Sequence, residues 1–380
     1  MEKSCFWQGK FKADAVKEVF SWREVNEIIF FQRIGSDRLR MSMLNESPMP
    51  ARKLFSSGSD GVDGGLDHLL VDGFHELLEC GATAVLDSVN ETSCVLNQLA
   101  EDICRRYHAK CAINAYMSFG INAGFGAHHD DQDLIVVQIE GRKNWCFFGN
   151  ANVDYADVSN MDGPSEKDIS KKIFVERGDV LYVPKGMWHH AQGIGEPSLH
   201  LAIGLGYPTI GEFLSWVVAV NQKSVPFEDI KSSDFRAEAV SRKILNFLHS
   251  VCGPREVNLF LADHYSRIRC ARIRSDVLNR FFVADGDVFA RIPAFFIKGD
   301  VDVDTDMIHV HALGCRFTLS IDEVKLLENF LHGSLTYREV LKVFSSERGR
   351  GEIDLILKNL LKAGLITKIG AFDNQRGLEL

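Results

Sequence analysis

The chain has 380 residues, of which 46% are hydrophobic and 25% charged, and its formal net charge is −9. This length suits two or three domains, and the apolar fraction is that of an ordinary globular protein with a large core. The acidic balance argues against broad, nonspecific binding to DNA or RNA, although it allows a local basic patch. No uninterrupted apolar stretch approaches membrane-spanning length, which argues against an integral membrane protein.

The nine cysteines are scattered along the chain, and none of them forms a C-x-x-C pair. An odd, unpatterned set of this kind predicts reduced thiols in a cytosolic protein, because disulfide frameworks use even and regularly spaced cysteines. The N-terminal sequence MEKSCFWQGKFKADAV lacks the apolar run of a signal peptide. We therefore predict a cytoplasmic location.

The N-terminal part, residues 1–95, is predicted to be an α/β segment. Residues 20–31 (FSWREVNEIIFF) end in an apolar run that fits a strand. Four further elements are expected in chain order: a flexible loop at 56–65, a helix at 66–80, a short apolar strand at 82–86 and an amphipathic helix at 90–108.

Residues 96–207 are predicted to hold a mainly β core. Five short apolar runs, broken by glycine and aspartate turns, are expected to contain strands: residues 111–119, 133–140, 143–149, 172–184 and 198–206. These runs suit a double-stranded β-helix of the jelly-roll type. The polar stretch at 151–172 is then an insert between strands, either a loop that shapes substrate entry or a plain solvent loop.

The pattern becomes helical over residues 208–291. Thr209 and Glu212 form a capping box in front of the apolar run LSWVVAVNQ. A second helix is predicted over residues 233–251. A helical segment is therefore expected to follow the β core.

Residues 292–380 are predicted to form a winged-helix-like domain. Its expected elements are two helices opened by the capping boxes Ser320–Glu323 and Thr336–Glu339, a third helix over 352–363, and a strand over 365–369. The third helix carries two lysines beside two acidic residues, which is a poor surface for phosphate. We expect a structural or protein-contact role here, and nucleic-acid binding is unlikely.

The main chemical signal is the stretch GFGAHHDDQDLIVVQIEGRKNW, residues 124–145. His128 and Asp130 are two residues apart, so in an extended chain both point to the same side. An imidazole nitrogen and a carboxylate oxygen are two thirds of the 2-His-1-carboxylate triad that holds non-heme Fe(II). The missing histidine is expected on another strand, and GDVLYVPKGMWHHA, residues 178–191, offers His189. The next residue is also a histidine, but on a strand it would face away from the metal.

These motifs resemble those of the JmjC-type ribosomal oxygenases, a branch of the cupin-fold 2-oxoglutarate/Fe(II) dioxygenases. In that family a glycine-rich turn leads into H-x-D, and then a strand leads into E-G-R-K-x-W, which stands here at residues 140–145. The block G-D-x-L-Y-x-P-x-G-x-x-H is present at residues 178–189. The resemblance is detailed over residues 110–206 and architectural elsewhere.

The resemblance implies that His128, Asp130 and His189 hold Fe(II) and act in catalysis, with 2-oxoglutarate as the co-substrate. It places Lys143 and Tyr116 on the far carboxylate of 2-oxoglutarate, and an ammonium group and a hydroxyl donor suit that role. It also implies that the N-terminal part packs on the barrel and that the helical segment forms a homodimer. Alternatively, those helices only cover the open side of the barrel.

Three positions depart from the family pattern. Ala127 stands where proline is usual, and His129 stands where an aromatic residue such as tyrosine is usual. Gly204 stands at the place of a serine or threonine on the last barrel strand. His129 and Gly204 suggest that the substrate pocket differs from that of the best-known members.

Three functions remain open at this point. The first is hydroxylation of a side chain of a protein or peptide, ribosomal or other, with release of succinate and CO2. The second is demethylation of N-methyl-lysine by the same chemistry, for which Asp131 and Asp133 are candidates for an acidic pocket. The third is a non-catalytic, metal-binding cupin scaffold, and Lys143 argues against it because a scaffold needs no cation for a co-substrate.

Overall fold

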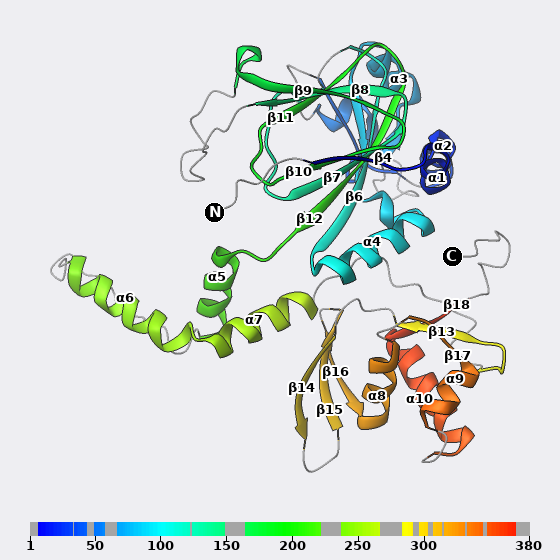
Figure 1. Ribbon diagram of the computed structural model, residues 1–380, viewed down its shortest axis with the longest axis vertical. Coiled ribbons are helices and arrows are strands. Elements are labelled where there is room, and N and C mark those ends of the chain that lie inside the picture. The colour runs from blue at the N-terminus through cyan, green and yellow to red at the C-terminus, as the bar shows by residue number, and fades with distance from the viewer. Residues whose placement is uncertain are drawn as a thin grey trace. The chain divides into compact units, whose positions relative to one another are not determined.

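The computed structural model is shown in Figure 1. It describes residues 7–32, 34–43, 49–57, 67–121, 124–148, 164–221, 237–266, 283–291, 296–302, 307–313, 315–330, 333–344 and 348–369. The loop predicted at 56–65 and the insert predicted at 151–172 lie largely outside these ranges. The chain divides into two compact units, Met1–Tyr207 and Pro208–Leu380. Among the described residues, no helix has the length and apolar character needed to cross a membrane.

The first unit is built on a large antiparallel sheet. In spatial order its seven strands are β1 (Trp7–Lys10), β10 (Asp179–Val183), β7 (Asp133–Glu140), β12 (Ser198–Gly206), β6 (Lys110–Ser118), β5 (Thr83–Leu86) and β2 (Leu39–Ser42). Burial alternates along β6, as expected for a strand that has one face in the core. The central strand β12 is buried along almost its whole length, because both of its faces are covered.

A second, three-stranded antiparallel sheet faces the first. Its strands are β11 (His189–Gly193), β8 (Arg142–Phe148) and β9 (Ile169–Glu176), with β8 in the middle. Outside the named strands, a backbone bridge joins β11 to the chain at His128. The predicted run 172–184 therefore contains parts of two strands in different sheets, separated by the turn at Gly178.

The inner faces of the two sheets share one apolar core. Its buried residues come from β7, β8, β9 and β10 and are Leu134, Val136, Trp145, Phe147, Ile173, Val175, Leu181 and Val183. Two antiparallel sheets that close on a common core form a jelly roll. The prediction of a double-stranded β-helix is confirmed.

Helices and short segments flank this barrel. They are α1 (Ala13–Val19), α2 (Trp22–Phe31), α3 (Val71–Glu79), α4 (Cys94–Tyr107), the strand pair β3 (Phe55–Ser57) and β4 (Asp67–Leu69), and the 3₁₀ turns η1 (Ala51–Lys53), η2 (Val89–Glu91) and η4 (Glu166–Asp168). The amphipathic helix predicted at 90–108 corresponds to η2 and α4. The helix predicted at 66–80 begins later, because its first residues form β4.

The strand predicted at the end of residues 20–31 is wrong, since this stretch is the helix α2. Ser21 caps the helix by accepting a hydrogen bond from the Arg23 backbone N–H. Val25 and Ile28 lie three residues apart and are both buried on one face. Phe30 and Phe31 remain exposed. The apolar run was misleading because the i, i+3 spacing, and not the run itself, marks the buried face.

The prediction that all cysteines are reduced is wrong for Cys104, which is disulfide-bonded. This residue lies on α4 and is fully buried. Among the other cysteines that the structure describes, six form no disulfide: Cys80, Cys94, Cys111, Cys146, Cys252 and Cys315. Spacing along the sequence does not reveal which thiols meet in space, so the disulfide had no sequence signal.

The second unit begins with three helices, α5 (Ile210–Val220), α6 (Ala237–Val251) and α7 (Pro254–Ser266). The predicted capping box is present, because Thr209 and Glu212 each bond the other's backbone N–H. Phe213 and Trp216 of α5 pack against Phe260 of α7, with ring centroids 5.4 and 5.8 Å away. The prediction of a helical segment is confirmed for these residues.

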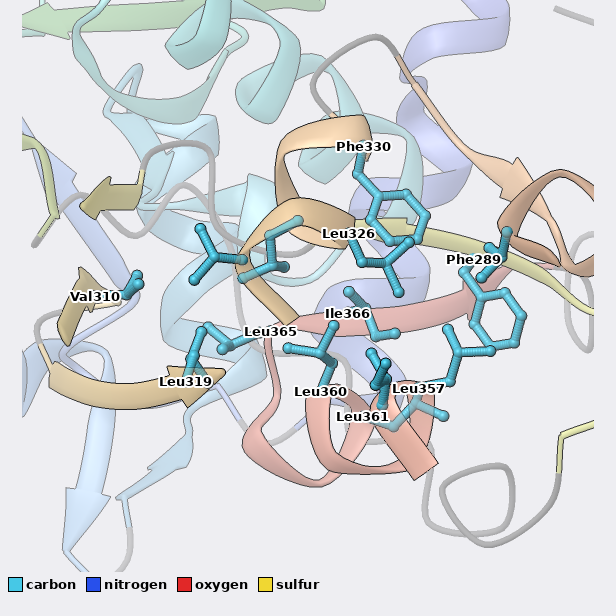
Figure 2. Packing of buried hydrophobic residues seen from close by; sticks show 14 of the residues in the cluster. Phe289, Val310, Leu319, Leu326, Phe330, Leu357, Leu360, Leu361, Leu365 and Ile366 are labelled. Carbon is cyan, nitrogen blue, oxygen red and sulfur yellow. The ribbon is translucent and has the colours of Figure 1, made fainter. Parts of the chain in front are cut away.

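The remaining elements of this unit surround a separate apolar core. They are the strands β13 (Val288–Arg291), β14 (Phe296–Asp302), β15 (Met307–Ala312), β16 (Cys315–Ser320), β17 (Leu335–Thr336) and β18 (Ile366–Ile369), and the helices α8 (Ile321–Asn329), α9 (Tyr337–Val343) and α10 (Arg350–Ala363). Figure 2 shows Leu357, Leu360 and Leu361 of α10 packed beside Ile366 of β18. Both predicted capping boxes are formed, and Gly364 ends α10 in a left-handed conformation.

Candidate active site

The backbone of the smaller sheet brings His128 and His189 together. The His128 N–H donates to the His189 carbonyl at 3.0 Å, and the His189 N–H donates to the His128 carbonyl at 2.8 Å. Residues that exchange both backbone bonds project their side chains to the same side of a sheet. The two imidazole rings consequently lie with their centroids 4.5 Å apart.

Backbone carbonyls fix the tautomer of both rings. His128 Nδ1 lies 3.1 Å from the Gly126 carbonyl, and His189 Nδ1 lies 2.8 Å from the Met187 carbonyl. A carbonyl oxygen has no proton to give, so each Nδ1 carries the proton and each Nε2 keeps a free lone pair. Burial, followed by the nearby His128, lowers the pKa of His189 to about 3, so this ring is neutral.

Asp130 completes the cluster. Its Oδ2 atom lies 3.5 Å from His189 Nε2, and no described residue donates a hydrogen bond to it. Burial raises the pKa of this carboxyl. The ligand atoms of His128, Asp130 and His189 all lie within 4.8 Å of one another. His190 lies outside the cluster, with its ring edge against Phe148 at 5.5 Å.

The glycine-rich approach to His128 is shaped by close backbone packing. Gly124 passes so near β5 that a Cβ atom there would overlap the Thr83 side chain. Its carbonyl accepts a hydrogen bond of 2.7 Å from the buried Ser42 hydroxyl. A larger residue at position 124 would push this segment away from the sheet, so the glycine sets where the turn that leads to His128 lies.

Lys143 lies in the wall of the same pocket. It sits on β8 between Val175 of β9 and Gly193 of β11 and is only 2% exposed. Among the described residues, none forms a hydrogen bond or ion pair with its ammonium group, and burial alone lowers the pKa of Lys143 to about 7. A buried amine without a partner is costly, and an anion bound beside it would offset that cost.

Tyr116 lines the pocket from β6. Arg40 lies within hydrogen-bonding reach of its hydroxyl, and burial raises the pKa of that hydroxyl. Arg40 in turn forms a bidentate ion pair with Asp87, in which Nε and Nη2 donate to the two carboxylate oxygens at 2.7 and 3.1 Å. The Tyr116 ring also packs edge-on against Phe125 at 5.9 Å. The hydroxyl therefore belongs to the pocket and is oriented by Arg40.

His200 is a pocket residue that the sequence analysis missed. It lies on β12, is 3% exposed, and lines the pocket together with Lys143 and Tyr116. Its ring stacks on Tyr116 with a centroid distance of 4.9 Å and an interplanar angle of 9°. The available signal was a lone polar side chain inside the apolar strand SLHLAIGLG.

Two of the departures from the family pattern lie elsewhere. Gly204 faces Gln132, whose side chain a Cβ atom at position 204 would overlap. His129 packs edge-on against Trp188 at 4.9 Å. Neither residue is among those that line the pocket. The expectation that His129 and Gly204 change the substrate pocket stays a prediction.

The geometry defines a class of protein: a double-stranded β-helix with two histidines and one carboxylate around a common point. Residues 89–213 match the family model of the JmjC domain. The match agrees with the JmjC resemblance that the sequence motifs indicated for this part of the chain.

Similar proteins of known sequence include the bifunctional lysine-specific demethylase and histidyl-hydroxylase NO66 of Drosophila mojavensis. It is 29% identical over 117 residues, which are 29% of this chain and 13% of that protein. The protein of the same name from Culex quinquefasciatus is 33% identical over 105 residues, which are 26% of this chain and 16% of that protein. The matches thus span less than a fifth of the length of these relatives.

Among solved structures, Escherichia coli ycfD has a TM-score of 0.57 and 14% sequence identity, covering 96% of this chain and 94% of that chain. Another structure of this ribosomal oxygenase, solved with cobalt and 2-oxoglutarate, has a TM-score of 0.54 and 15% identity, covering 97% of this chain and 95% of that chain. At this identity the likeness shows a shared fold, which extends over both units.

Proposed function

We propose that the protein is a 2-oxoglutarate- and Fe(II)-dependent dioxygenase that hydroxylates a side chain of a protein or peptide and releases succinate and CO2. The observation that carries this proposal is the convergence of His128, Asp130 and His189 in a pocket whose wall also holds the buried Lys143. A scaffold that only binds a metal has no use for a desolvated amine beside it. The non-catalytic alternative therefore leaves Lys143 unexplained.

The donor set fits Fe(II). Two imidazole Nε2 atoms and one carboxylate oxygen, from His128, His189 and Asp130, would hold the ion. The buried Asp130 Oδ2 has no hydrogen-bond donor among the described residues, and a cation would satisfy it. When bound, Fe(II) and 2-oxoglutarate supply the oxidation, coupling decarboxylation of the keto acid to hydroxylation of a C–H bond.

Lys143 and Tyr116 would hold the far carboxylate of 2-oxoglutarate. An arriving carboxylate favours the protonated amine, so the pKa of Lys143 would rise from its value of about 7. Tyr116 would contribute a hydroxyl donor that Arg40 orients. Binding of 2-oxoglutarate at neutral pH would thus be accompanied by proton uptake at Lys143. The ammonium group and the far carboxylate would then balance each other's charge.

Apolar side chains would keep water from the reacting atoms. Leu134, Trp145 and Ala202 line the pocket beside the triad. Trp145 also stacks on the His189 ring, with a centroid distance of 5.6 Å and an interplanar angle of 23°, and so restrains its orientation. A dry, shaped pocket strengthens the electrostatic contacts within it.

The substrate class is a protein or peptide side chain, by likeness to relatives named for histidyl hydroxylation and ribosomal oxygenation. Demethylation of N-methyl-lysine by the same chemistry is the alternative, since the NO66 relatives are also named as lysine-specific demethylases. Asp133 does not support an acidic lysine pocket, because its Oδ1 accepts a hydrogen bond of 2.8 Å from the Lys185 backbone N–H. We therefore favour hydroxylation.

The test is succinate release from 2-oxoglutarate in the presence of Fe(II) and oxygen, with a library of peptides as substrates. A peptide product heavier by one oxygen atom supports hydroxylation. Formaldehyde release supports demethylation instead. Binding of metal and 2-oxoglutarate without turnover of any peptide would support the scaffold.

The proposed organisation has four parts: a segment at 1–95 packed on the barrel, the catalytic barrel at 96–207, a helical segment at 208–291 and a winged-helix-like domain at 292–380. The helical segment is proposed to form a homodimer. In support, α5, α6 and α7 expose large apolar side chains: Ile210, Leu214, Val218, Val220, Ile244, Leu245, Val257 and Leu259. Apolar faces of this kind are typical of subunit contacts.

For the winged-helix-like domain, the support is the order of α8, α9 and α10 followed by β18, which pairs with β13. The exposed face of α10 carries Lys358 and Lys362 together with Glu352. This mixed surface favours a structural or protein-contact role over nucleic-acid binding. A cytoplasmic location is proposed from the described cysteines that form no disulfide and is tested by cell fractionation.

A further inference from the structure

His200 lies in the pocket with a hydrogen-bonding capacity that the fold does not use. It is 3% exposed, its Nδ1 atom is buried, and no described residue bonds that atom. A buried polar atom that lacks a partner destabilises the folded protein relative to a satisfied one. Side chains left in this state in a folded protein need an explanation, and a bound ligand is one.

The pairing of β12 with its two neighbouring strands fixes the position of His200 in the pocket lining. On one side His200 is paired with Tyr116 of β6, and on the other with Gln138 of β7. The β12–β7 register shifts between Leu199 and His200, and such irregularities re-aim side chains. The Tyr116 face lies parallel to the ring, and Trp145 meets it edge-on at 5.7 Å and 74°. The ring is therefore fixed.

His200 and Lys143 line the same pocket. Burial, followed by the charge of Lys143, lowers the pKa of His200 well below its ordinary value, so the ring is neutral. A neutral imidazole carries one N–H donor. Lys143 also has no partner for its ammonium group among the described residues. One carboxylate between them would satisfy a cation and an N–H donor at once.

We propose that His200 is a co-substrate-binding residue that donates a hydrogen bond to the far carboxylate of 2-oxoglutarate, next to Lys143. This inference rests on the proposed function and adds a third donor to the two that the resemblance implies. The expected consequence is selectivity for a keto acid that ends in a carboxylate.

The test is a binding cycle between residue and ligand, using protein loaded with Mn(II) under nitrogen so that no turnover occurs. Calorimetry gives the affinity for 2-oxoglutarate and, by competition, for 2-oxopentanoate, in which a methyl group replaces the far carboxylate. His200→Phe keeps an aromatic ring against Tyr116 and removes the N–H. We expect it to weaken 2-oxoglutarate about tenfold and to leave 2-oxopentanoate unchanged.

Equal weakening of both ligands, or no weakening of either, would overturn the role of His200, because a residue that only packs cannot distinguish the two ligands. His200→Gln retains an N–H donor and should keep most of the selectivity, which guards against a folding defect in the phenylalanine variant. His75→Phe on α3, outside the pocket, is the matched control and should bind as wild type.

Lys143→Met separates this inference from the proposed function. It should remove most of the preference for 2-oxoglutarate, because the ammonium group that would face the far carboxylate is lost. If Lys143→Met shows this loss and His200→Phe does not, the dioxygenase proposal stands and the role of His200 falls. If the wild-type protein loaded with Mn(II) binds no 2-oxoglutarate, both fall together.

Discussion

His128 and His189 each use Nδ1 to contact a backbone carbonyl, and these contacts decide which nitrogen faces the metal position. Asp130 supplies the only carboxylate of the cluster. At the scale of single residues, the backbone therefore fixes the orientation of the two imidazole rings without the help of a metal. Lys143 is different, because its protonation changes with what binds beside it.

Replacing His128 by alanine tests the cluster. We expect His128→Ala to weaken Mn(II) or Co(II) binding more than about 100-fold, since two ligands hold a divalent ion far less tightly than three. Calorimetric titration of the metal measures this loss. His75→Ala on α3 is the control and should bind metal as wild type does. Metal affinity that survives in His128→Ala would place the ion elsewhere.

Lys143 should destabilise the metal-free protein. Its pKa falls from 10.5 to about 7 on burial, so the folded state binds its proton less well than the unfolded state. The resulting loss in the free energy of unfolding is absent above pH 10.5, grows as the pH falls, and reaches its full size below about pH 7. Lys143→Met should therefore raise the free energy of unfolding at pH 7 by on the order of a few kcal/mol.

Urea unfolding at several pH values measures this effect. The gain from Lys143→Met should shrink as the pH rises from 7 towards 10.5, because the wild-type protein regains stability over that interval. A variant that is less stable than wild type at pH 7 would show that Lys143 has a partner in the folded protein.

At the scale of elements, the turn between β7 and β8 controls where Lys143 lies. Gly141 has a φ of +65°, and a Cβ atom there would overlap the Pro197 carbonyl. Neither the conformation nor the space suits another residue. This turn sets the register of β8 against β9 and β11, and therefore which β8 side chains face the pocket.

Gly141→Ala should lower the free energy of unfolding by about 2 kcal/mol or more, through both left-handed strain and overlap. Gly195→Ala is the matched control, since φ is +83° there but the nearest atom to a Cβ, on Ile121, is an ordinary contact at 3.4 Å. It should cost only about 1 kcal/mol. Urea unfolding followed by tryptophan fluorescence measures both, and equal losses would contradict the overlap.

At the scale of the whole molecule, the helical segment offers a test of assembly. Ile210 and Val218 of α5 are 78% and 45% exposed. If this face joins two copies, Ile210→Glu combined with Val218→Glu should convert the dimer to a monomer while leaving Mn(II) binding intact. Light scattering coupled to size exclusion measures the mass. A wild-type protein that is already monomeric would contradict the homodimer.

Much of the molecule follows from local sequence patterns. The barrel strands, the capping boxes and the convergence of His128 and Asp130 depend on spacings within a few residues. His200 could not be predicted in the same way, because its place depends on the pairing of β12 with both β6 and β7 and on an irregular register. The disulfide at Cys104 likewise depends on contacts that are distant in sequence.

The central claim is that a metal held by three side chains and the amine of Lys143 together bind one 2-oxoglutarate molecule. Calorimetric titration of 2-oxoglutarate into wild-type protein, with and without Mn(II), and into His189→Ala with Mn(II), tests it most directly. We predict one binding site in the wild-type protein with Mn(II), and no measurable binding when either the metal or the His189 imidazole is removed. Binding of equal strength under all three conditions would contradict the account.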